Sequence, residues 1–314
     1  MEPRIRAVRK SDLPQVYDLL EAAFPEARRE MFVAQTENDS TFRLRHGRVA
    51  LIDSRVAGYV RIFARTMLVR GVPLPAGGIG QVATDPAARH HGVATALMRD
   101  AIDAMKREGM ALSFLFTGIP AFYERVGYRI VRQPHFESNA RDMDLDGSRR
   151  YYGVRLLDLS RDLPALLAIR RRATAGTTGA IVRTKPSWLD AQCWLAEYGS
   201  SFVAHQHGQL VAYLRSHCRN HGHRILEVEC IEGHDAAIPE LLAAMASRRC
   251  ACGDAVNGSV PDRSALATYL RGRASTQEAS EYQYPMMALN LAGDPEIDAA
   301  LEREPLHFWN ADRI

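Results

Sequence analysis

Residues 85–98, DPAARHHGVATALM, lead into a helix without the usual cap. Most helices begin at a Ser, Thr, Asp or Asn whose side chain accepts a hydrogen bond from one of the first backbone amides. The residues directly before Val93 are instead three basic side chains and a glycine, Arg89, His90, His91 and Gly92. Upstream, GGIGQVATDP (77–86) predicts a β-strand that Pro86 ends. An irregular loop therefore joins a strand to a helix whose first amides have no side-chain partner.

A ligand with negative charge suits those amides. The positive end of the helix dipole and the side chain of Arg89 both favour an anion, and Gly92 lets a phosphate approach the backbone. The apolar residues of the helix share one face, which is predicted to be buried: Val93, Leu97, Ala101, Ala104 and Met105. We therefore predict that a phosphate-containing ligand takes the place of the cap.

Two common phosphate-binding motifs do not fit this sequence. No G-x-x-x-x-G-K-[ST] is present, which excludes a P-loop nucleotide site. Residues 78–83, GIGQVA, match the dinucleotide fingerprint G-x-G-x-x-A, but they lie within a strand, and Asp85-Pro86 follows where that motif needs a helix. The sequence thus argues against a Rossmann fold.

Length and composition predict a two-domain globular protein. The chain has 314 residues, which is long for one core; 46% are hydrophobic and 25% charged. The net charge of +3 is too small to predict a nucleic-acid partner. The N-terminal MEPRIRAVRK lacks the apolar region of a signal peptide, and no apolar run of membrane-spanning length occurs. We therefore expect a cytoplasmic protein with no membrane partner and, from five irregularly spaced cysteines, no required disulfide.

The two halves of the chain resemble each other. IRAVRKSDLPQVYDLL from Ile5 and VRLLDLSRDLPALLAI from Val154 each predict a short strand, Asp-Leu-Pro and an amphipathic helix. At a constant offset, Val49-Ala50 and Tyr59-Val60-Arg61 match Val203-Ala204 and Tyr213-Leu214-Arg215, each pair flanking a hairpin turn. A tandem duplication explains this pattern; chance similarity of common strand–helix segments is the alternative.

We therefore predict an α+β fold class with tandem units, each a mixed, mostly antiparallel sheet flanked by helices. The polar, aperiodic SNARDMDLDGSRR (138–150) predicts a linker. The predicted division is a first domain at 1–137, the linker at 138–150, a second domain at 151–290 and a C-terminal tail at 291–314. In the first domain we expect helices at 12–23, 28–37, 93–107 and 120–125, strands at 5–9, 48–53, 56–70, 79–84 and 111–116, and a further strand from Tyr128.

The loop and a second motif together resemble the GNAT superfamily of acyl-CoA-dependent N-acyltransferases. RHHGVA (89–94) fits R-x-x-G-x-A, with which that family holds the CoA pyrophosphate, and AFYERVGYR (121–129) is similar to its F-Y-x-x-x-G-F/Y signature. The motifs occur in the family's order, and the resemblance covers about residues 4–137. Tandem units with a terminal tail are similar to the enhanced intracellular survival (Eis) aminoglycoside acetyltransferases, although the sterol-carrier-like region of those proteins is reduced here to a tail.

The resemblance implies an acetyl-CoA-dependent N-acetyltransferase whose catalytic domain is 1–137. It implies that the amide of Val82 stabilises the oxyanion and that Tyr123 protonates the leaving thiolate. The implied cofactor-binding residues follow the strand and the loop: Val82, Ala83, Thr84, Arg89, His90, His91, Gly92, Val93, Ala94 and Thr95.

The sequence leaves the general base open. An alkylammonium has a pKa of about 10.4, so a base assists its deprotonation at neutral pH. The strand GGIGQVAT has no carboxylate where many members of the family place a Glu. Phe24, Glu26 and Glu30, on the segment that borders the acceptor site in this fold, are candidate substrate-binding residues. The two glutamates are candidate bases, with a plain surface role as the alternative.

The C-terminal tail offers another base. In Eis-like enzymes the C-terminal carboxylate reaches the active site of the N-terminal domain. We therefore predict that HFWNADRI (307–314) packs between the units and brings the carboxylate of Ile314 near Tyr123. A tail that only fills the interface is the alternative.

The second half shows no cofactor motif. In EVECIEGHDAAIPELL, where the corresponding loop is expected, Glu227, Glu229, Glu232 and Asp235 occur without an Arg, and four carboxylates should repel a pyrophosphate. Its histidines lack a convincing set of Cys or carboxylate partners, so no metal site is predicted. We expect this domain to be degenerate.

The leading hypothesis is transfer of an acetyl group from acetyl-CoA to a primary amine of a small molecule or peptide. An aminoglycoside-like polyamine, a small metabolite amine and a peptide N-terminus all fit. We expect no nucleic-acid partner, and the sequence is compatible with a homo-oligomer. The alternative is a non-catalytic acyl-CoA-binding sensor or interaction module, which the missing strand glutamate favours.

Overall fold

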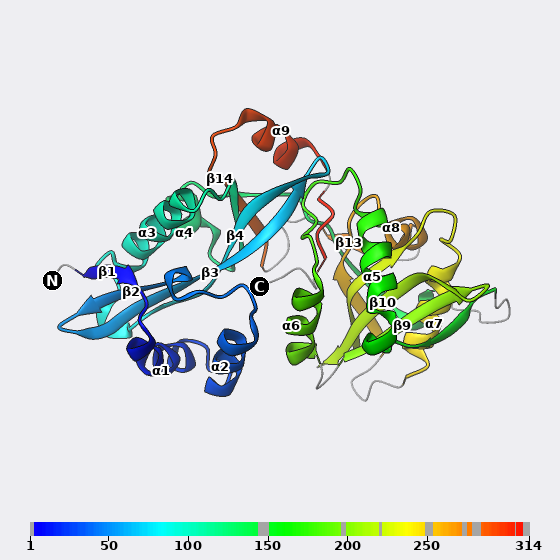
Figure 1. The fold of residues 1–314 in the computed structure, drawn as a ribbon, viewed down its shortest axis with the longest axis horizontal. Helices are drawn as coiled ribbons and strands as arrows, with labels where there is room; N and C mark the ends of the chain where they lie inside the picture. The colour runs from blue at the N-terminus through cyan, green and yellow to red at the C-terminus, as the bar shows by residue number, and fades with distance from the viewer. Residues whose placement is uncertain are drawn as a thin grey trace.

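The computed structural model consists of two units, each built on a seven-stranded mixed sheet (Figure 1). It describes residues 3–143, 151–195, 199–219, 222–248, 254–271, 275–277, 284–304 and 306–309. The strand orders are β1-β2-β3-β4-β5-β14-β6 and β13-β7-β12-β11-β10-β9-β8. Each sheet contains one parallel pair, β4 with β5 and β11 with β12. The predicted fold class, tandem mixed-sheet units, is confirmed.

The first unit follows the predicted order of elements. Its helices are α1 (Leu13–Ala23), α2 (Arg29–Asn38), α3 (Val93–Arg107) and α4 (Pro120–Glu124), and its first strands are β1 (Arg4–Ala7), β2 (Gly47–Ile52), β3 (Arg55–Val69), β4 (Val72–Thr84), β5 (Leu112–Phe116) and β6 (Arg129–Ile130). The helix expected at 93–107 has those bounds, whereas β4 begins at Val72 rather than at residue 79. Pairing with β3 carries that strand through Pro73 and Pro75, which in a sequence indicate a break.

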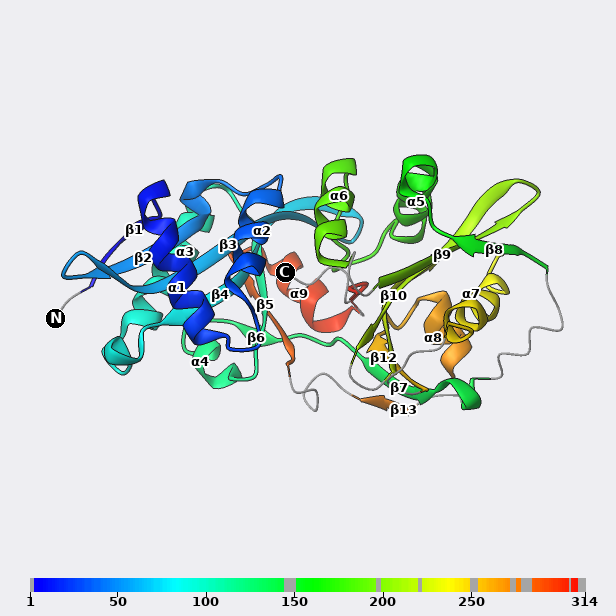
Figure 2. The same cartoon turned by 90° about the horizontal axis from the view of Figure 1, so that it is seen from below.

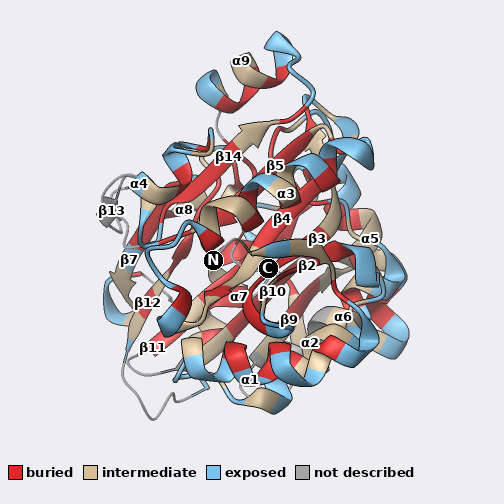
Figure 3. Ribbon diagram, turned by 90° about the vertical axis from the view of Figure 1, so that its left-hand side faces the viewer, coloured by how far each residue is buried: buried red, intermediate tan, exposed pale blue. Residues whose placement is uncertain are grey.

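Helices cover both faces of the first sheet, and the buried residues lie between them and the strands (Figure 3). Tyr59 and Val60 are neighbours on β3 but belong to different cores, because successive side chains point to opposite faces. α3 lies close to the sheet because two strand residues are glycines. A Cβ on Gly77 would be 2.2 Å from Sδ of Met105, and a Cβ on Gly58 would be 2.7 Å from Leu97.

The second unit repeats this arrangement. Its elements are β8 (Gly153–Leu156), α5 (Leu159–Ala173), α6 (Lys185–Leu195), β9 (Gly199–Gln206), β10 (Gln209–Arg219), β11 (Gly222–Cys230), α7 (Ala237–Ala246), β12 (Ala255–Ser259), α8 (Ala265–Leu270) and β13 (Ser275–Gln277). Val49 faces Tyr59 in the first unit, and Val203 faces Tyr213 in the second, at the predicted offset. The internal repeat in the sequence is thus a repeat of strand register.

A matching ion pair ties the first strand of each unit to its first helix. Arg6 donates to both carboxylate oxygens of Asp12, at 2.6 and 3.0 Å, and Arg155 does so to Asp162, at 2.6 and 2.7 Å. The bond from Arg155 lowers the pKa of Asp162 to about 2. The Asp-Leu-Pro motif therefore has the same structural role in both halves.

The two units exchange a strand, which changes the predicted boundaries. β7 (His135–Asn139) lies in the second sheet beside β12, and β14 (Met286–Asn290) lies in the first sheet between β5 and β6. The boundaries predicted at 137 and 290 therefore do not separate the sheets, and the predicted linker begins inside β7. The alternation of a strand indicates which face is buried, but its pairing partner is distant in sequence.

The segment after β14 joins the two units. The predicted tail contains a helix, α9 (Pro295–Arg303), drawn near the middle of Figure 2, whose buried Ile297, Ala300 and Leu301 pack into the core of the first unit. Phe308 is completely buried in the first unit, with ring-centroid distances of 5.7 Å to Phe114 and 5.4 Å to Phe116. Trp309 is completely buried in the core of the second unit. Two consecutive side chains thus enter different cores.

One expectation from the cysteines is corrected. Cys218 on β10 is disulfide-bonded, although the cysteine spacing predicted no required disulfide. In the described parts of the chain, no helix has both the length and the apolar character that crossing a membrane requires.

Candidate active site

The loop before α3 leaves the first amides of that helix without a side-chain cap. Gly92 is the N-cap residue and has a left-handed backbone, with φ of +76°; a Cβ placed there would meet nothing within 4 Å. His90 is also left-handed, at φ of +65°. Asp85 caps the short 3-10 turn η3 (Pro86–Ala88) instead, accepting a hydrogen bond from the N–H of Ala87 at 2.8 Å. The first amides of α3 therefore stay available to a ligand.

The charge around this helix end favours an anion. Arg89, His90 and His91 are all exposed, and Nε of Arg89 lies 3.4 Å from the carbonyl oxygen of Thr84. Helix amides and a guanidinium are both good donors to phosphate oxygens. The other predicted cofactor residues adjoin this point: Val93, Ala94 and Thr95 form the first turn of α3, and Val82, Ala83 and Thr84 end β4.

β4 carries a bulge just before the loop. Tyr59 faces Ala83 and Arg61 faces Gly80, so Gln81 and Val82 together lie opposite a single residue of β3. Gln81 has a left-handed backbone, with φ of +52°, which is uncommon for a residue with a side chain. A bulge removes backbone groups from regular ladder pairing. The amide of Val82, the predicted oxyanion donor, belongs to this bulge.

Tyr123, the predicted acid, lies in α4 and is almost completely buried, with 7% of its surface exposed. Its ring packs edge-on against Phe122 and Tyr128. Burial raises the pKa of Tyr123 to about 12, although a hydrogen bond with Thr117 acts in the opposite direction. The phenol is therefore protonated at neutral pH and able to donate a hydrogen bond.

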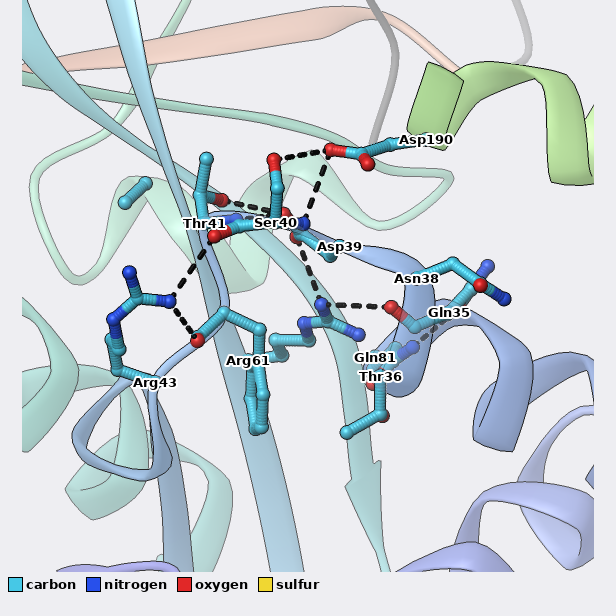
Figure 4. A network of polar contacts seen from close by, with 12 residues as sticks. Gln35, Thr36, Asn38, Asp39, Ser40, Thr41, Arg43, Arg61, Gln81 and Asp190 are labelled. Atoms are coloured by element: carbon cyan, nitrogen blue, oxygen red, sulfur yellow. Dashed lines mark hydrogen bonds and ion pairs between the residues drawn. The ribbon is translucent and has the colours of Figure 1, made fainter. Parts of the chain in front are cut away.

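A polar network on the α2 side of the bulge contains residues that the sequence did not single out as site candidates (Figure 4). Arg61 is completely buried, and its guanidinium lies 4.7 Å from the ring of Phe42 and 4.3 Å from that of Phe63. Its Nη2 donates to Oδ2 of Asp39 at 2.9 Å. The sequence feature that could have indicated this network is Arg61, an arginine within an apolar strand segment. Arg215 occupies the matching position in the second half of the chain.

The network reaches the bulge through Gln35. Nη2 of Arg61 also donates to the backbone carbonyl of Gln35, at 3.2 Å. The side chain of Gln35 accepts a hydrogen bond from the side-chain amide of Gln81. A continuous chain of contacts therefore runs from the buried arginine to the bulged strand.

Asp39 ends α2, and contacts from both units hold the segment around it. Burial alone would raise the pKa of Asp39, but Arg65, Thr41 and Arg61 together outweigh it and keep the pKa below its ordinary value. The next residue, Ser40, donates from its N–H and its hydroxyl to Oδ2 of Asp190 on α6, at 3.1 and 2.5 Å. The second unit thus fixes the segment that carries Asp39.

The three predicted substrate residues lie at the α1–α2 connection. Phe24 ends α1 and packs against Phe32, with ring centroids 6.0 Å apart. Glu26 and Glu30 are exposed, and neither makes a hydrogen bond or ion pair with another described residue. Their geometry neither joins them to Tyr123 nor assigns them a role, so these residues stay predictions.

Two of the four carboxylates that were expected to repel a pyrophosphate are buried in an ion network of the second unit. Nη1 of Arg170 lies 2.8 Å from Glu227 and 2.7 Å from Glu229, and Arg183 and Arg215 each lie 3.4 Å from Glu227. The repulsion argument is therefore wrong for these two residues, because arginines distant in sequence neutralise them. Glu232 and Asp235 are exposed and line a cavity of about 500 Å³ before α7.

Glu229 also anchors the tail. His307 and Trp309 both contact its Oε1 through their side-chain nitrogens, at 2.7 and 2.9 Å. Burial would raise the pKa of Glu229, but His307 and Arg170 outweigh it and lower the pKa. Ile314 lies outside the described residues, so its place near Tyr123 stays a prediction.

The first unit matches a known domain family. The model of the acetyltransferase (GNAT) domain matches residues 4–131. Over 135 residues the chain is 31% identical to an uncharacterized N-acetyltransferase of Streptomyces avermitilis, a match that covers 41% of this chain. The match covers 32% of that relative, so the chain spans about a third of its length.

Solved structures share the fold across both units. A GCN5-related N-acetyltransferase from Anabaena variabilis has a TM-score of 0.75 at 17% identity, covering 92% of this chain and 73% of that one. Eis1 from Mycobacterium abscessus has a TM-score of 0.66 at 15% identity, covering 96% and 76%. Saccharomyces cerevisiae N-myristoyltransferase with bound myristoyl-CoA has a TM-score of 0.60 at 12% identity, covering 92% and 83%. At these identities the likeness establishes a shared fold.

Proposed function

Because residues 4–131 form a GNAT acetyltransferase domain, we propose that the protein transfers the acetyl group of acetyl-CoA to a primary amine of a small molecule or peptide. The observation that carries the proposal is the uncapped start of α3, where left-handed Gly92 and exposed Arg89 adjoin a bulged strand. Bare helix amides and a guanidinium suit the pyrophosphate of CoA. The thioester then lies along the end of β4.

The proposed chemistry uses two groups of the first unit. The amine nitrogen attacks the thioester carbon, a C–N bond forms and the C–S bond breaks. The amide of Val82 donates a hydrogen bond to the oxyanion that develops during attack. Tyr123 donates its proton, or a strong hydrogen bond, toward the departing sulfur, since its pKa of about 12 keeps it protonated. The acceptor proton goes to a general base.

The carboxylate of Ile314 is the base that we propose, on the resemblance to Eis-like enzymes and on the anchoring of His307 and Trp309 between the units. Appending a few glycines after Ile314 moves that carboxylate without altering Phe308 or Trp309. We expect kcat to fall by about 10²-fold, the contribution typical of a general base. If kcat stays within about threefold, the carboxylate is not the base, and Glu26, Glu30 or a water bound to Gln81 takes its place.

Reversing the charge at the loop tests cofactor binding. Arg89→Glu is expected to weaken acetyl-CoA binding by about 10–100-fold, because it replaces a charge-assisted phosphate contact with repulsion. Calorimetric titration measures the change. Arg99→Glu is the matched control, since Arg99 is an exposed residue of the same helix farther from its start. Equal losses in both variants would point to overall charge rather than to a site.

Thiol release from acetyl-CoA over a panel of amines tests the chemistry. Turnover of any amine above the hydrolysis background supports the transferase. Tight acetyl-CoA binding without turnover of any amine supports the alternative, a non-catalytic acyl-CoA sensor.

A further inference from the structure

We propose that Arg61 is a positioning residue for acetyl transfer, which fixes the bulge at Gln81 and Val82 from the buried side of the sheet. This inference rests on the proposed function and deepens it. It names a residue that acts on the oxyanion donor without touching the substrate.

The bulge needs support from its surroundings. A left-handed backbone is disfavoured for a residue with a Cβ, and it persists only where neighbouring structure determines it. Gln81 has this conformation, and its side chain is bonded to Gln35 on α2. The position of α2 therefore helps to set the direction of the bulge amides.

Arg61 joins α2 to the sheet at this point. Its backbone faces Gly80 on β4, directly before the bulge. Its guanidinium reaches the carbonyl of Gln35 at 3.2 Å and the carboxylate of Asp39 at 2.9 Å, both near the end of α2. One side chain thus spans the strand beside the bulge and the helix that holds Gln81.

The fold alone does not require an arginine at this position. Arg61 is completely buried, and its Nε and Nη1 atoms are buried without a hydrogen-bond partner. Burying a guanidinium is unfavourable, and an apolar residue of similar volume often gives equal or greater stability. The rings of Phe42 and Phe63 on either side would suit such a residue. The fixed contacts to α2 are what an apolar residue would lose.

The second unit provides an internal comparison. Arg215, the counterpart of Arg61, is also buried and lies 4.5 Å from the ring of Trp188. It contacts Glu227, the residue that faces it on the neighbouring strand β11. No described non-glycine residue of β11 has a left-handed backbone. β11 also has a bulge beside Arg215, where Leu226 lies between the partners of Arg215 and Ser216. The helix-directed arginine therefore accompanies a bulge with a left-handed non-glycine residue, and the strand-paired arginine accompanies a bulge without one.

Arg61→Met tests the inference with the whole protein. We expect kcat to fall by about 10–100-fold, as a small displacement of a catalytic group causes, and the KM for acetyl-CoA to stay within about threefold. The specific readout is the infrared carbonyl stretch of bound acetyl-CoA labelled with ¹³C in the acetyl group. The wild-type frequency should lie below that of free acetyl-CoA, and the variant should lose most of that shift.

Arg48→Met is the matched control. Arg48 is another buried arginine of the first unit, paired with Asp100 on α3 at 2.5 Å. Its loss should affect stability but not the carbonyl frequency. An equal fall of kcat in both variants, or an unchanged carbonyl frequency in Arg61→Met, would overturn the inference.

If Arg61→Met does not fold, a conservative variant provides the test. Arg61→Lys keeps the charge but donates fewer hydrogen bonds, so an intermediate carbonyl frequency supports the inference and a wild-type frequency refutes it. Wild-type protein that does not bind acetyl-CoA is a separate outcome. It would overturn the proposed function, and the inference with it.

Discussion

Replacing Tyr123 by phenylalanine is expected to lower kcat for acetyl transfer by about 10²–10³-fold, while the KM for acetyl-CoA stays within about threefold. The ring keeps its packing against Phe122 and Tyr128, so the protein loses a single hydroxyl group. In the proposed mechanism, that hydroxyl is needed when negative charge develops on the sulfur. Its loss should therefore appear in kcat rather than in ground-state binding.

Tyr128→Phe is the matched control for this prediction. Its hydroxyl is also buried, but it is bonded to Ser113 at 2.7 Å, and Ser113 keeps its bond to the carbonyl of Gly77. We expect kcat of this variant to stay within about threefold of wild type. Similar losses in the two variants would mean that Tyr123 acts through packing and not as an acid.

The pKa of Tyr123 also predicts the pH dependence. An acid acts only while it is protonated, so activity that depends on Tyr123 persists below its pKa of about 12 and is lost as the pH rises through that value. Deprotonation of an alkylammonium acceptor, with a pKa of about 10.4, increases the reactive fraction as pH rises. We expect kcat/KM to rise up to about pH 9.5 without a descending limb. A decline that begins near neutral pH would contradict the assignment.

Local patterns in the sequence determined the elements correctly where contacts are local. The helix over 93–107 was predicted with its observed bounds because five apolar residues repeat on one face and Gly92 ends the loop. The exchange of β7 and β14 was not predictable in this way. The predicted linker covers the end of β7, and only pairing over long sequence distances assigns β7 and β14 to their sheets.

The site residues show the same contrast between local sequence patterns and long-range contacts. Two short motifs predicted the loop before α3 and Tyr123 as site residues, because each lies within its own signature. Asp39 was missed because it lies in a polar segment without periodicity, and its partner Arg61 is 22 residues away. Glu227 and Glu229 were misread as free charges for the same reason. Their arginine partners become visible only when the strands and helices are assembled.

Trp309→Ala is expected to destabilise the second unit by about 3–5 kcal/mol. The indole is completely buried in that unit's core, and its Nε1 donates to Glu229 at 2.9 Å. Its removal leaves a cavity and takes one donor from a buried carboxylate, while Arg170 and His307 remain. Urea unfolding followed by circular dichroism measures the loss of stability.

Phe308→Ala separates the two roles of the tail. Phe308 packs on Phe114 in the first unit, so its loss should cost a similar free energy there. Hydrogen exchange followed by mass spectrometry can distinguish the variants: Trp309→Ala should increase exchange in β11, and Phe308→Ala should increase exchange in β5. Equal increases in both strands for either variant would show that the segment joins the units into one cooperative structure. If Trp309→Ala instead lowers the free energy of unfolding by less than about 1 kcal/mol, the tail is not part of the core, because removing a buried tryptophan costs more than that.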